Sequence, residues 1–208
     1  MKIKDVLYDC TKMNEFEFIQ KYSKENKLGK ILYDLADIIC NDKNSSMARE
    51  YSTLKECNYS QNESKMDYDG YDLDNNPVEA KPQNYYTNTS SKNPRKLNGS
   101  GSFNDYTWER YDKTKEDNPT VLFSGFIDGK LLYILSVKYN DIDNIKTSLE
   151  KEFPNRVRKK GHYLRCIKIS YNNYKNASSF EIKYIDKEKL KEYNRYISND
   201  LYQRLINE

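Results

Sequence analysis

The chain has little of what zinc-binding and disulfide-rich folds need. It contains one histidine, His162, and 4 cysteines that lie far apart, with no Cys-x-x-Cys pair. A structural zinc site takes closely spaced sulfur and nitrogen ligands, and disulfide frameworks occur in small secreted domains, so neither is expected here. We therefore expect free thiols in a reducing cytoplasm.

Long hydrophobic stretches are also missing. The N-terminal residues, Met1 to Asp5, have no apolar core of the kind found in a signal peptide. The longest apolar run extends from Val121 to Val137, and Asp128, Gly129 and Lys130 interrupt it. Such a run cannot span a bilayer. The sequence thus predicts a soluble cytoplasmic protein without a membrane partner.

Charge of one sign is not in large excess either. Lys and Arg number 35 and Asp and Glu number 32, which leaves a net charge of +3. So small a balance does not by itself indicate nucleic acid, and what matters is whether the basic residues cluster. Only 37% of the 208 residues are hydrophobic, but the 20 tyrosines can supply apolar surface to a core. The length fits one domain, 1–208.

Apolar spacing divides the chain into helices and strands. Spacings of three and four residues predict helices over about 14–40 with a break at Gly29, over 46–57, from Asn104 or Asp105 to 117, over 141–153 and over 187–206. Apolar runs predict a hairpin of buried strands, 120–127 and 130–139, and further strands over 163–171 and 180–185. The Ser-, Asn- and Gly-rich stretch 87–102 is typical of a surface loop. This order predicts an α+β fold in which a mixed sheet is flanked by helices.

The most informative stretch is a candidate hairpin over about 65–85. Its second arm carries Glu79 and Lys81, which point to the same face because side chains two apart in a strand do so. The aspartate that joins them depends on the register. A loop of three or five residues sets Asp69 opposite Lys81, and a loop of two or four sets Asp72 opposite Glu79. We favour Asp69, because Gly70 after it lets the strand bend away, and Asp72 or Asp67 is the alternative.

These groups suit Mg²⁺ binding and phosphodiester hydrolysis. Mg²⁺ takes carboxylate oxygens, waters and a substrate phosphate as ligands, and it lowers the pKa of a bound water. Asp69 and Glu79 are the expected ligands, with Glu50 of the preceding helix at the outer side of the site. Lys81 would orient the attacking water and stabilise developing negative charge as a fixed donor.

In this context Asp69, a short hairpin and Glu79-Ala80-Lys81 resemble the PD-(D/E)XK nuclease superfamily, which includes most type II restriction endonucleases. The resemblance covers about residues 46–137, in the order helix, hairpin, helix and strand. The sequence departs from it in having no proline before Asp69 and no evident strand in 58–66. The resemblance implies a restriction-endonuclease-like fold, catalytic residues Asp69, Glu79 and Lys81, a Mg²⁺ cofactor, and double-stranded DNA as the substrate within a restriction system.

Basic residues are dense in one place, 156–165, at the start of the C-terminal region 154–208 that we expect to recognise DNA. Such a cluster can neutralise phosphates, and Arg158 or Arg165 can read guanine in a groove. A second basic patch lies in the loop 87–102, which can close over DNA. The alternative is a charged loop with no partner. The expected nucleic-acid contacts are Gln83, Asn84, Lys92, Arg95, Lys96, Arg156, Arg158, Lys159, Lys160, His162 and Arg165.

Three different functions are compatible with these residues. The first is an endonuclease acting as a homodimer, because one site cuts one strand and two-fold symmetry suits a palindromic target. The second is a nucleic-acid-binding or phage-defence protein with the same fold and no catalysis. The third is an unrelated interaction domain in which Glu79 and Lys81 form a surface ion pair. A second Glu-x-Lys, Glu181-Ile182-Lys183, has only Asp186 as a nearby acidic partner, on the far side of the triplet.

Overall fold

Helices and strands of this chain form an α+β fold, as the sequence predicts. The computed structural model describes residues 3–22, 26–43, 46–62, 64, 67–88 and 95–208. The strands in these residues are β1 (Ser60–Gln61), β2 (Gly70–Tyr71), β3 (Pro77–Tyr85), β4 (Gly101–Tyr106), β5 (Thr120–Ile127), β6 (Lys130–Lys138), β7 (Leu164–Ile169) and β8 (Glu181–Ile185). The helices are α1 (Ile3–Lys12), α2 (Glu15–Tyr22), α3 (Asn26–Cys40), α4 (Met47–Glu56), α5 (Trp108–Asp117), α6 (Ile145–Glu152), α7 (Lys187–Glu192) and α8 (Asn199–Ile206).

The larger sheet has six strands in the order β1-β2-β3-β5-β6-β8, and β4 pairs with β7 in a separate two-stranded ribbon. In the larger sheet β3 and β5 are parallel and the other neighbours are antiparallel. All residues of β5 are buried, and Asp128 and Gly129 turn the chain into β6 with φ of 45° and 74°. The predicted hairpin of central strands is therefore confirmed.

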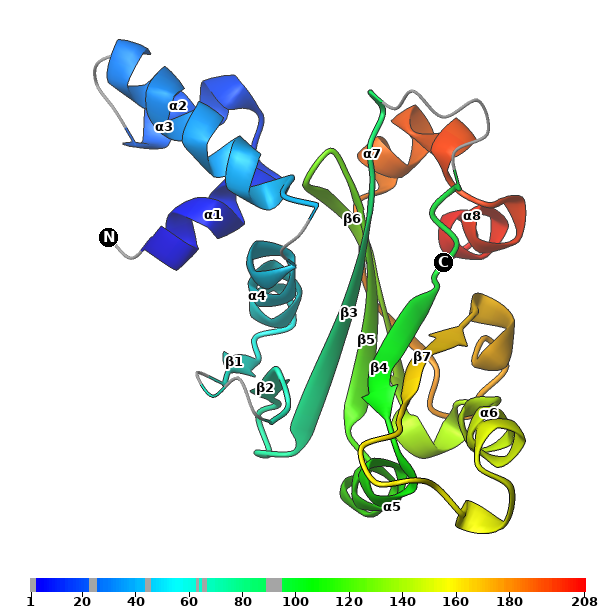
Figure 1. Ribbon diagram of the computed structural model, residues 1–208. Coiled ribbons are helices and arrows are strands. Elements are labelled where there is room, and N and C mark those ends of the chain that lie inside the picture. Colours follow the sequence, from blue (N-terminus) through cyan, green and yellow to red (C-terminus); the bar gives the residue numbers. More distant parts are fainter. Residues whose placement is uncertain (1–2, 23–25, 44–45, 63, 65–66, 89–94) are drawn as a thin grey trace.

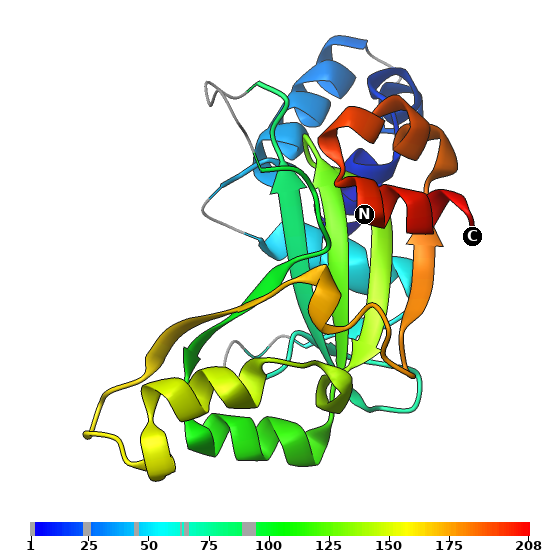
Figure 2. The ribbon, with the colours of Figure 1, turned by 90° about the vertical axis from the view of Figure 1, so that its right-hand side faces the viewer.

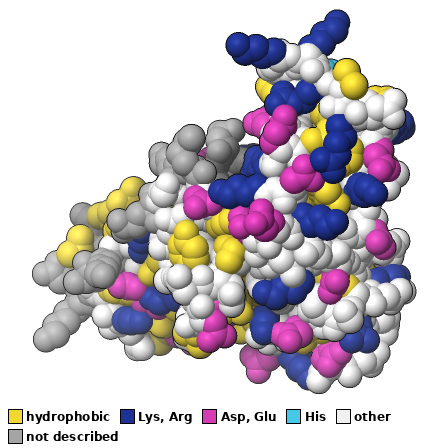
Figure 3. Space-filling model, turned by 90° about the horizontal axis from the view of Figure 1, so that it is seen from below, with side chains coloured by type: hydrophobic (Ala, Val, Ile, Leu, Met, Phe, Trp, Pro, Cys, Tyr) yellow, Lys and Arg dark blue, Asp and Glu magenta, His cyan; other side chains and the backbone are white. Residues whose placement is uncertain are grey.

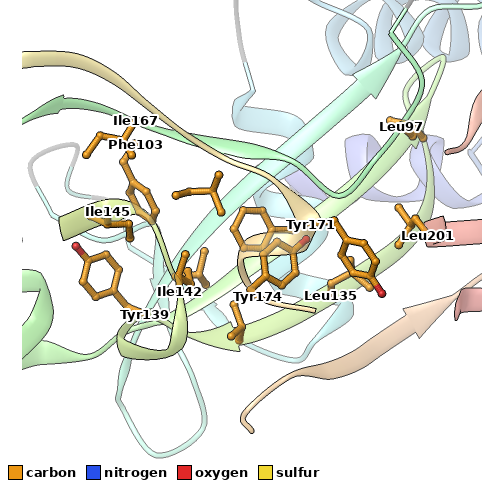
Figure 4. Close-up of a cluster of buried hydrophobic side chains, with 14 of the residues drawn as sticks. Leu97, Phe103, Leu135, Tyr139, Ile142, Ile145, Ile167, Tyr171, Tyr174 and Leu201 are labelled. Atoms are coloured by element: carbon orange, nitrogen blue, oxygen red, sulfur yellow. The ribbon is translucent and has the colours of Figure 1, made fainter. Parts of the chain in front are cut away.

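Helices lie on both sides of the larger sheet (Figures 1 and 2). On one face, Leu54 of α4 packs in a cluster with Val78, Leu122 and Phe126. The other face is covered by the β4–β7 ribbon together with α5, α6 and α8. Figure 4 shows part of this larger core, in which side chains of the ribbon meet those of β6 and of the segment after β7. The ribbon continues past the end of the sheet toward α5 and α6 (Figure 2).

The N-terminal helices have a small core of their own, and α1 was not predicted. Val6, Leu7 and Cys10 of α1 pack against Phe18 of α2 and Ala36 of α3, and the three helices stand together at one end of the molecule (Figure 1). The predicted break at Gly29 is wrong, because α3 continues through this residue, from Asn26 to Cys40.

Three other predicted boundaries differ from the structure. Residues 104–106 belong to β4 and not to a helix, and α5 begins only after Thr107, whose side chain accepts a hydrogen bond from Arg110 N. The predicted loop 87–102 ends in a strand, because β4 starts at Gly101. The predicted helix 187–206 is two helices, separated where Ile197 forms a β-bridge with Leu97.

Among the described residues, no helix is both long enough and apolar enough to cross a membrane.

Candidate functional site

The first arm of the candidate hairpin is much shorter than the second, and this leaves one edge of β3 open. Gly70 and Tyr71 of β2 pair only with Val78 and Pro77, so β3 runs on alone along that edge from Glu79. The loop 72–76 has five residues. Continuing the register sets Asp69 opposite Glu79, and not opposite Lys81 as we expected for a loop of this length. Residues 65 and 66, at the start of the predicted hairpin, lie outside the described residues.

Of the alternative aspartates, Asp72 holds the turn, and Asp67 borders the hollow beside α5 that Glu79 also lines. The Asp72 carboxylate accepts hydrogen bonds from the backbone N–H groups of Asp74 at 3.0 Å and Asn76 at 2.8 Å, which hold the turn. Asp67 is exposed, and its carboxylate lies 3.7 Å from the Lys113 ammonium on α5.

Asp69, Glu79 and Lys81 meet at the open edge of β3. The Asp69 Oδ2 atom accepts a hydrogen bond of 2.7 Å from the backbone N–H of Ala80, a donor that a longer β2 would have used. Glu79 and Lys81 project from the same face of β3, and the Lys81 ammonium donates to a Glu79 carboxylate oxygen. The two side chains are only 12% and 18% exposed, so this is not a solvated surface pair.

The charges at this edge shift one another's protonation. Burial away from water, and then the negative charge of Glu79, raise the pKa of Asp69 to about 7. Burial lowers the pKa of Lys81, but the negative charges of Glu79, Asp69 and Glu50 outweigh it, so the pKa lies above its ordinary value. Lys81 is therefore a permanent cation and a hydrogen-bond donor, and it cannot serve as a general base near neutral pH.

Glu50 reaches the same region from α4. It borders the cleft that contains Lys81, and its charge raises the pKa of both Asp69 and Lys81. The Ser46 hydroxyl donates to the Glu50 carboxylate and holds it at the start of the helix. This agrees with the outer position that we expected for Glu50.

Two adjoining hollows flank the Glu79–Lys81 pair. Lys81 and Glu50 line a cleft of about 920 Å³, and Glu79 lines a second one of about 730 Å³ beside α5. Strand β4 separates them and crosses close to β3 at Gly101. A Cβ atom at Gly101 would lie 2.9 Å from Lys81 Cβ and 2.7 Å from Phe123 Cε1, so only glycine allows this crossing.

The side chains at this edge suit Mg²⁺, because they offer carboxylate oxygens, the ligands that this ion prefers, beside a cleft open to water. Asp69 and Glu79 would hold the ion. Burial and, after it, the negative charge of Glu79 raise the pKa of Asp69, and a cation would offset both effects. Within the part of the chain that the structure describes, no group of three or more acidic, histidine or cysteine side chains is placed to hold a metal. Waters and a substrate phosphate would have to complete the coordination.

Of the two polar residues after Lys81, only Gln83 lies at the cleft. Its side-chain oxygen accepts a hydrogen bond of 3.3 Å from the backbone N–H of Asn98. Asn84 points to the other face of β3, where its amide donates to Asn41 at 3.2 Å and accepts from the Gly129 N–H at 3.1 Å. Asn84 holds a turn in place and does not border the Lys81 cleft, where we expected it to contact a phosphate.

The basic cluster divides into two sets. Arg156 forms two hydrogen bonds with Asp112, at 2.7 and 3.1 Å, and lies over the Trp108 ring. Arg158 pairs with Glu109 at 3.2 Å and also donates to the backbone oxygen of His162. These arginines attach the segment before β7 to α5, and their contact with DNA stays a prediction.

The second set faces water. Lys159, Lys160 and Arg165 are exposed, and basic side chains gather at a protruding end of the molecule beside the single histidine (Figure 3). His162 itself lies 3.5 Å from Glu152 and packs edge-on against Phe153.

Arg95 and Lys96 are exposed as well, and Arg95 borders the larger cleft. Lys92 lies outside the described residues.

The outer face of the β4–β7 ribbon also lines the larger cleft, and we did not predict this face from the sequence. Ser102 pairs with Lys168 and Asn104 pairs with Cys166, so these polar side chains share one face while Phe103 and Ile167 turn inward. In the sequence, the apolar residues Ile167 and Ile169 alternate with the charged Lys168, and this alternation is the signal that could have predicted the face.

The competing Glu-x-Lys lies on the edge strand β8. Glu181 and Lys183 form an ion pair with side chains 59% and 33% exposed, and neither lines the cleft of Lys81.

No protein-family model matches this chain, and none of the curated proteins matches it significantly.

Proposed function

We propose that this protein is a Mg²⁺-dependent endonuclease that hydrolyses phosphodiester bonds of double-stranded DNA, with a site similar to that of the PD-(D/E)XK nucleases. One observation carries the proposal. A largely buried lysine is held between carboxylates at the open edge of a central strand, inside a cleft that has basic residues on its border.

The roles follow from the charges. Asp69 and Glu79 would hold the Mg²⁺, which supplies a water of lowered pKa and a positive charge beside the scissile phosphate. Lys81, which stays protonated, donates to an oxygen of the attacked phosphate or to the attacking water and stabilises the charge that builds up there. Glu50 orients groups around the site from α4 without touching the phosphate.

The order of elements supports the proposal. Helix α4 precedes the hairpin of β2 and β3, and α5 precedes β5, which is the order that the resemblance implies. The β1 strand, which the sequence did not reveal, pairs with β2 ahead of Asp69. Lys168 and Arg95 lie on the cleft border, where their positive charges suit a phosphate backbone.

The test is cleavage of supercoiled plasmid with Mg²⁺ or with chelator. We expect nicked and linear DNA only with Mg²⁺, and a rate at least roughly a hundredfold lower for Lys81→Ala and for Glu79→Ala. Lys183→Ala is the matched control, because it removes the lysine of the other Glu-x-Lys and should leave the rate unchanged. Equal loss of activity in Lys81→Ala and Lys183→Ala would contradict the assignment of the site.

A nucleic-acid-binding protein without catalysis is the second candidate. It is favoured by the lysine–glutamate ion pair, which uses one metal-binding carboxylate, and by the lack of a three-carboxylate group among the described residues. Salt-dependent DNA binding in Ca²⁺ without any cleavage in Mg²⁺ would support this candidate over the enzyme.

A further inference from the structure

Helix α3 has three faces where a surface helix usually has two. Its core face carries Gly29, Leu32, Ala36 and Cys40, which pack toward α1 and α2 or are buried there. A polar face carries Lys30, Asp34 and Asp37. The third face is apolar and exposed, and consists of Leu28, Ile31, Leu35, Ile38 and Ile39. We call it the α3 stripe.

The α3 stripe is too large to be incidental. Its side chains are 59%, 49%, 55%, 67% and 40% exposed in chain order, and together they run the length of the helix. A helix on a protein surface normally buries one apolar band and exposes polar residues on the rest. Contiguous exposed apolar patches of this kind mark interaction sites. Figure 3 shows hydrophobic side chains at the edge of the molecule where the N-terminal helices lie.

We propose that the α3 stripe is the contact through which two copies of this chain associate, with the two α3 helices antiparallel about a two-fold axis. Leu28, Ile31, Leu35 and Ile38 are spaced by three, four and three residues, which is the seam along which two helices interlock. The seam is apolar from end to end, so a second copy presents a surface of matching length and chemistry.

The charges of α3 select the antiparallel arrangement. Lys30 is in its N-terminal half and Asp34 and Asp37 are in its C-terminal half, with no acidic residue in the first turn and no basic residue in the last. Within the chain Lys30 lies 2.9 Å from Glu15 and 3.0 Å from Asp34, and Asp37 lies 3.5 Å from Lys130. Acidic residues stabilise the positive N-terminus of a helix and basic residues its negative C-terminus, so the charges of α3 are placed unfavourably for its own dipole. An antiparallel copy sets the two helix dipoles in opposite directions and brings the acidic C-terminal half of one helix beside the N-terminus of the other, which carries no acidic residue of its own in the first turn.

A lipid surface fits the stripe less well. Helices that lie on membranes carry many basic residues on their polar face, whereas the polar face of α3 carries Asp34 and Asp37 beside Lys30. Binding of this chain to anionic vesicles in place of self-association would overturn the proposal.

The inference does not rest on the nuclease chemistry, because α3 lies outside the Lys81 cleft. It is tested on the full chain without DNA or Mg²⁺, by sedimentation velocity over a wide range of concentrations. We expect a monomer–dimer equilibrium, with the dimer dissociation constant raised about a hundredfold or more by Leu35→Lys, since a two-fold axis places each substitution at the contact twice. Ile38→Lys is the second variant.

Leu73→Lys is the matched control. Leu73 lies in the turn between β2 and β3, is 82% exposed, and undergoes the same change of side chain away from α3. Circular dichroism checks that all three variants fold. A monomer at every concentration for the unchanged chain, or the same weakening by Leu73→Lys as by Leu35→Lys, would refute the α3 contact.

The orientation is tested with one added cysteine in a chain in which the exposed Cys166 and the partly exposed Cys57 are replaced by serine, which leaves only the buried Cys10 and Cys40. In the antiparallel arrangement Leu28 of one copy lies near Ile38 of the other. Leu28→Cys and Ile38→Cys chains should therefore cross-link when mixed and oxidised, and neither should do so efficiently alone. Efficient cross-linking of each variant with itself would show a parallel pair and overturn the proposed orientation.

Discussion

Replacing Asp69 by asparagine should stabilise the metal-free protein at neutral and alkaline pH. Burial and the nearby Glu79 carboxylate raise the pKa of Asp69 from 3.8 to about 7, so the folded protein holds its proton more tightly than the unfolded chain does. The stability of the unchanged protein therefore falls as the pH rises through this interval and then levels off. Asparagine carries no charge at any pH, and its amide oxygen can still accept the hydrogen bond of the Ala80 N–H.

The size of the effect follows from the two pKa values. Their separation corresponds to roughly 4 kcal/mol of unfolding free energy at pH 8. Solvent that reaches the site screens part of the repulsion, and we expect Asp69→Asn to raise the free energy of unfolding by about 1–3 kcal/mol at pH 8. Near pH 4 the unchanged residue is already protonated, so the two proteins should be almost equally stable.

The assay is urea unfolding followed by circular dichroism in the presence of a chelator, at both pH values. Asp72→Asn is the control, and we expect it to change the free energy of unfolding in the opposite direction. Asp72 is half-buried. Burial alone would raise the pKa of Asp72, but the hydrogen bonds that it accepts from Asn76 and Asp74 together outweigh burial and lower the pKa below its ordinary value. Its replacement should destabilise the protein at pH 8. A loss of stability in Asp69→Asn at pH 8, or an equal gain at both pH values, would refute the reasoning.

Mg²⁺ should make the unchanged protein more stable than Asp69→Asn, which reverses the order expected without metal. A cation that binds only the folded site raises the stability of the unchanged protein in proportion to the logarithm of its concentration. Asp69→Asn, which lacks one of the two carboxylates, should gain little. An equal gain for both proteins would place the metal elsewhere.

Three further changes are expected to have distinct outcomes. Gly101→Val should lower the free energy of unfolding by about 1–3 kcal/mol in urea, because its side chain would overlap Phe123, and preserved stability would contradict the close crossing of β4 and β3. Lys160→Ala should weaken DNA binding to all sequences alike and reduce the slope of log affinity against log salt concentration by about 1, whereas an unchanged slope would remove Lys160 from the interface. Asn84→Ala should cost about 1 kcal/mol of stability through its lost bond to Gly129 and leave plasmid cleavage intact, so a loss of cleavage at equal stability would return Asn84 to the site.

Local patterns were sufficient for the parts of the fold that close over short distances. The strands β5 and β6 are apolar along their length and joined by Asp128-Gly129, so the sequence predicts them and their turn together. The period of two along a strand was enough to place Glu79 and Lys81 on one face.

Features set by distant contacts could not be predicted in this way. Strand β4 begins with Gly101 and Ser102 and reads as a loop, and it forms because β7 pairs with it from far along the chain. The position of the five-residue loop between β2 and β3, at 72–76, decided that Asp69 lies opposite Glu79, and composition does not fix where such a loop begins. Arg156 and Arg158 looked available for phosphate until the fold brought Asp112 and Glu109 of α5 beside them.

The most direct test of the proposed site is a crystal structure of the protein with a short DNA duplex and Ca²⁺, which supports binding without cleavage. We expect a cation bound by the carboxylates of Asp69 and Glu79 and by an oxygen of one DNA phosphate, with the Lys81 ammonium beside that phosphate. DNA bound away from the Lys81 cleft, or a cation held by other residues, would contradict the account.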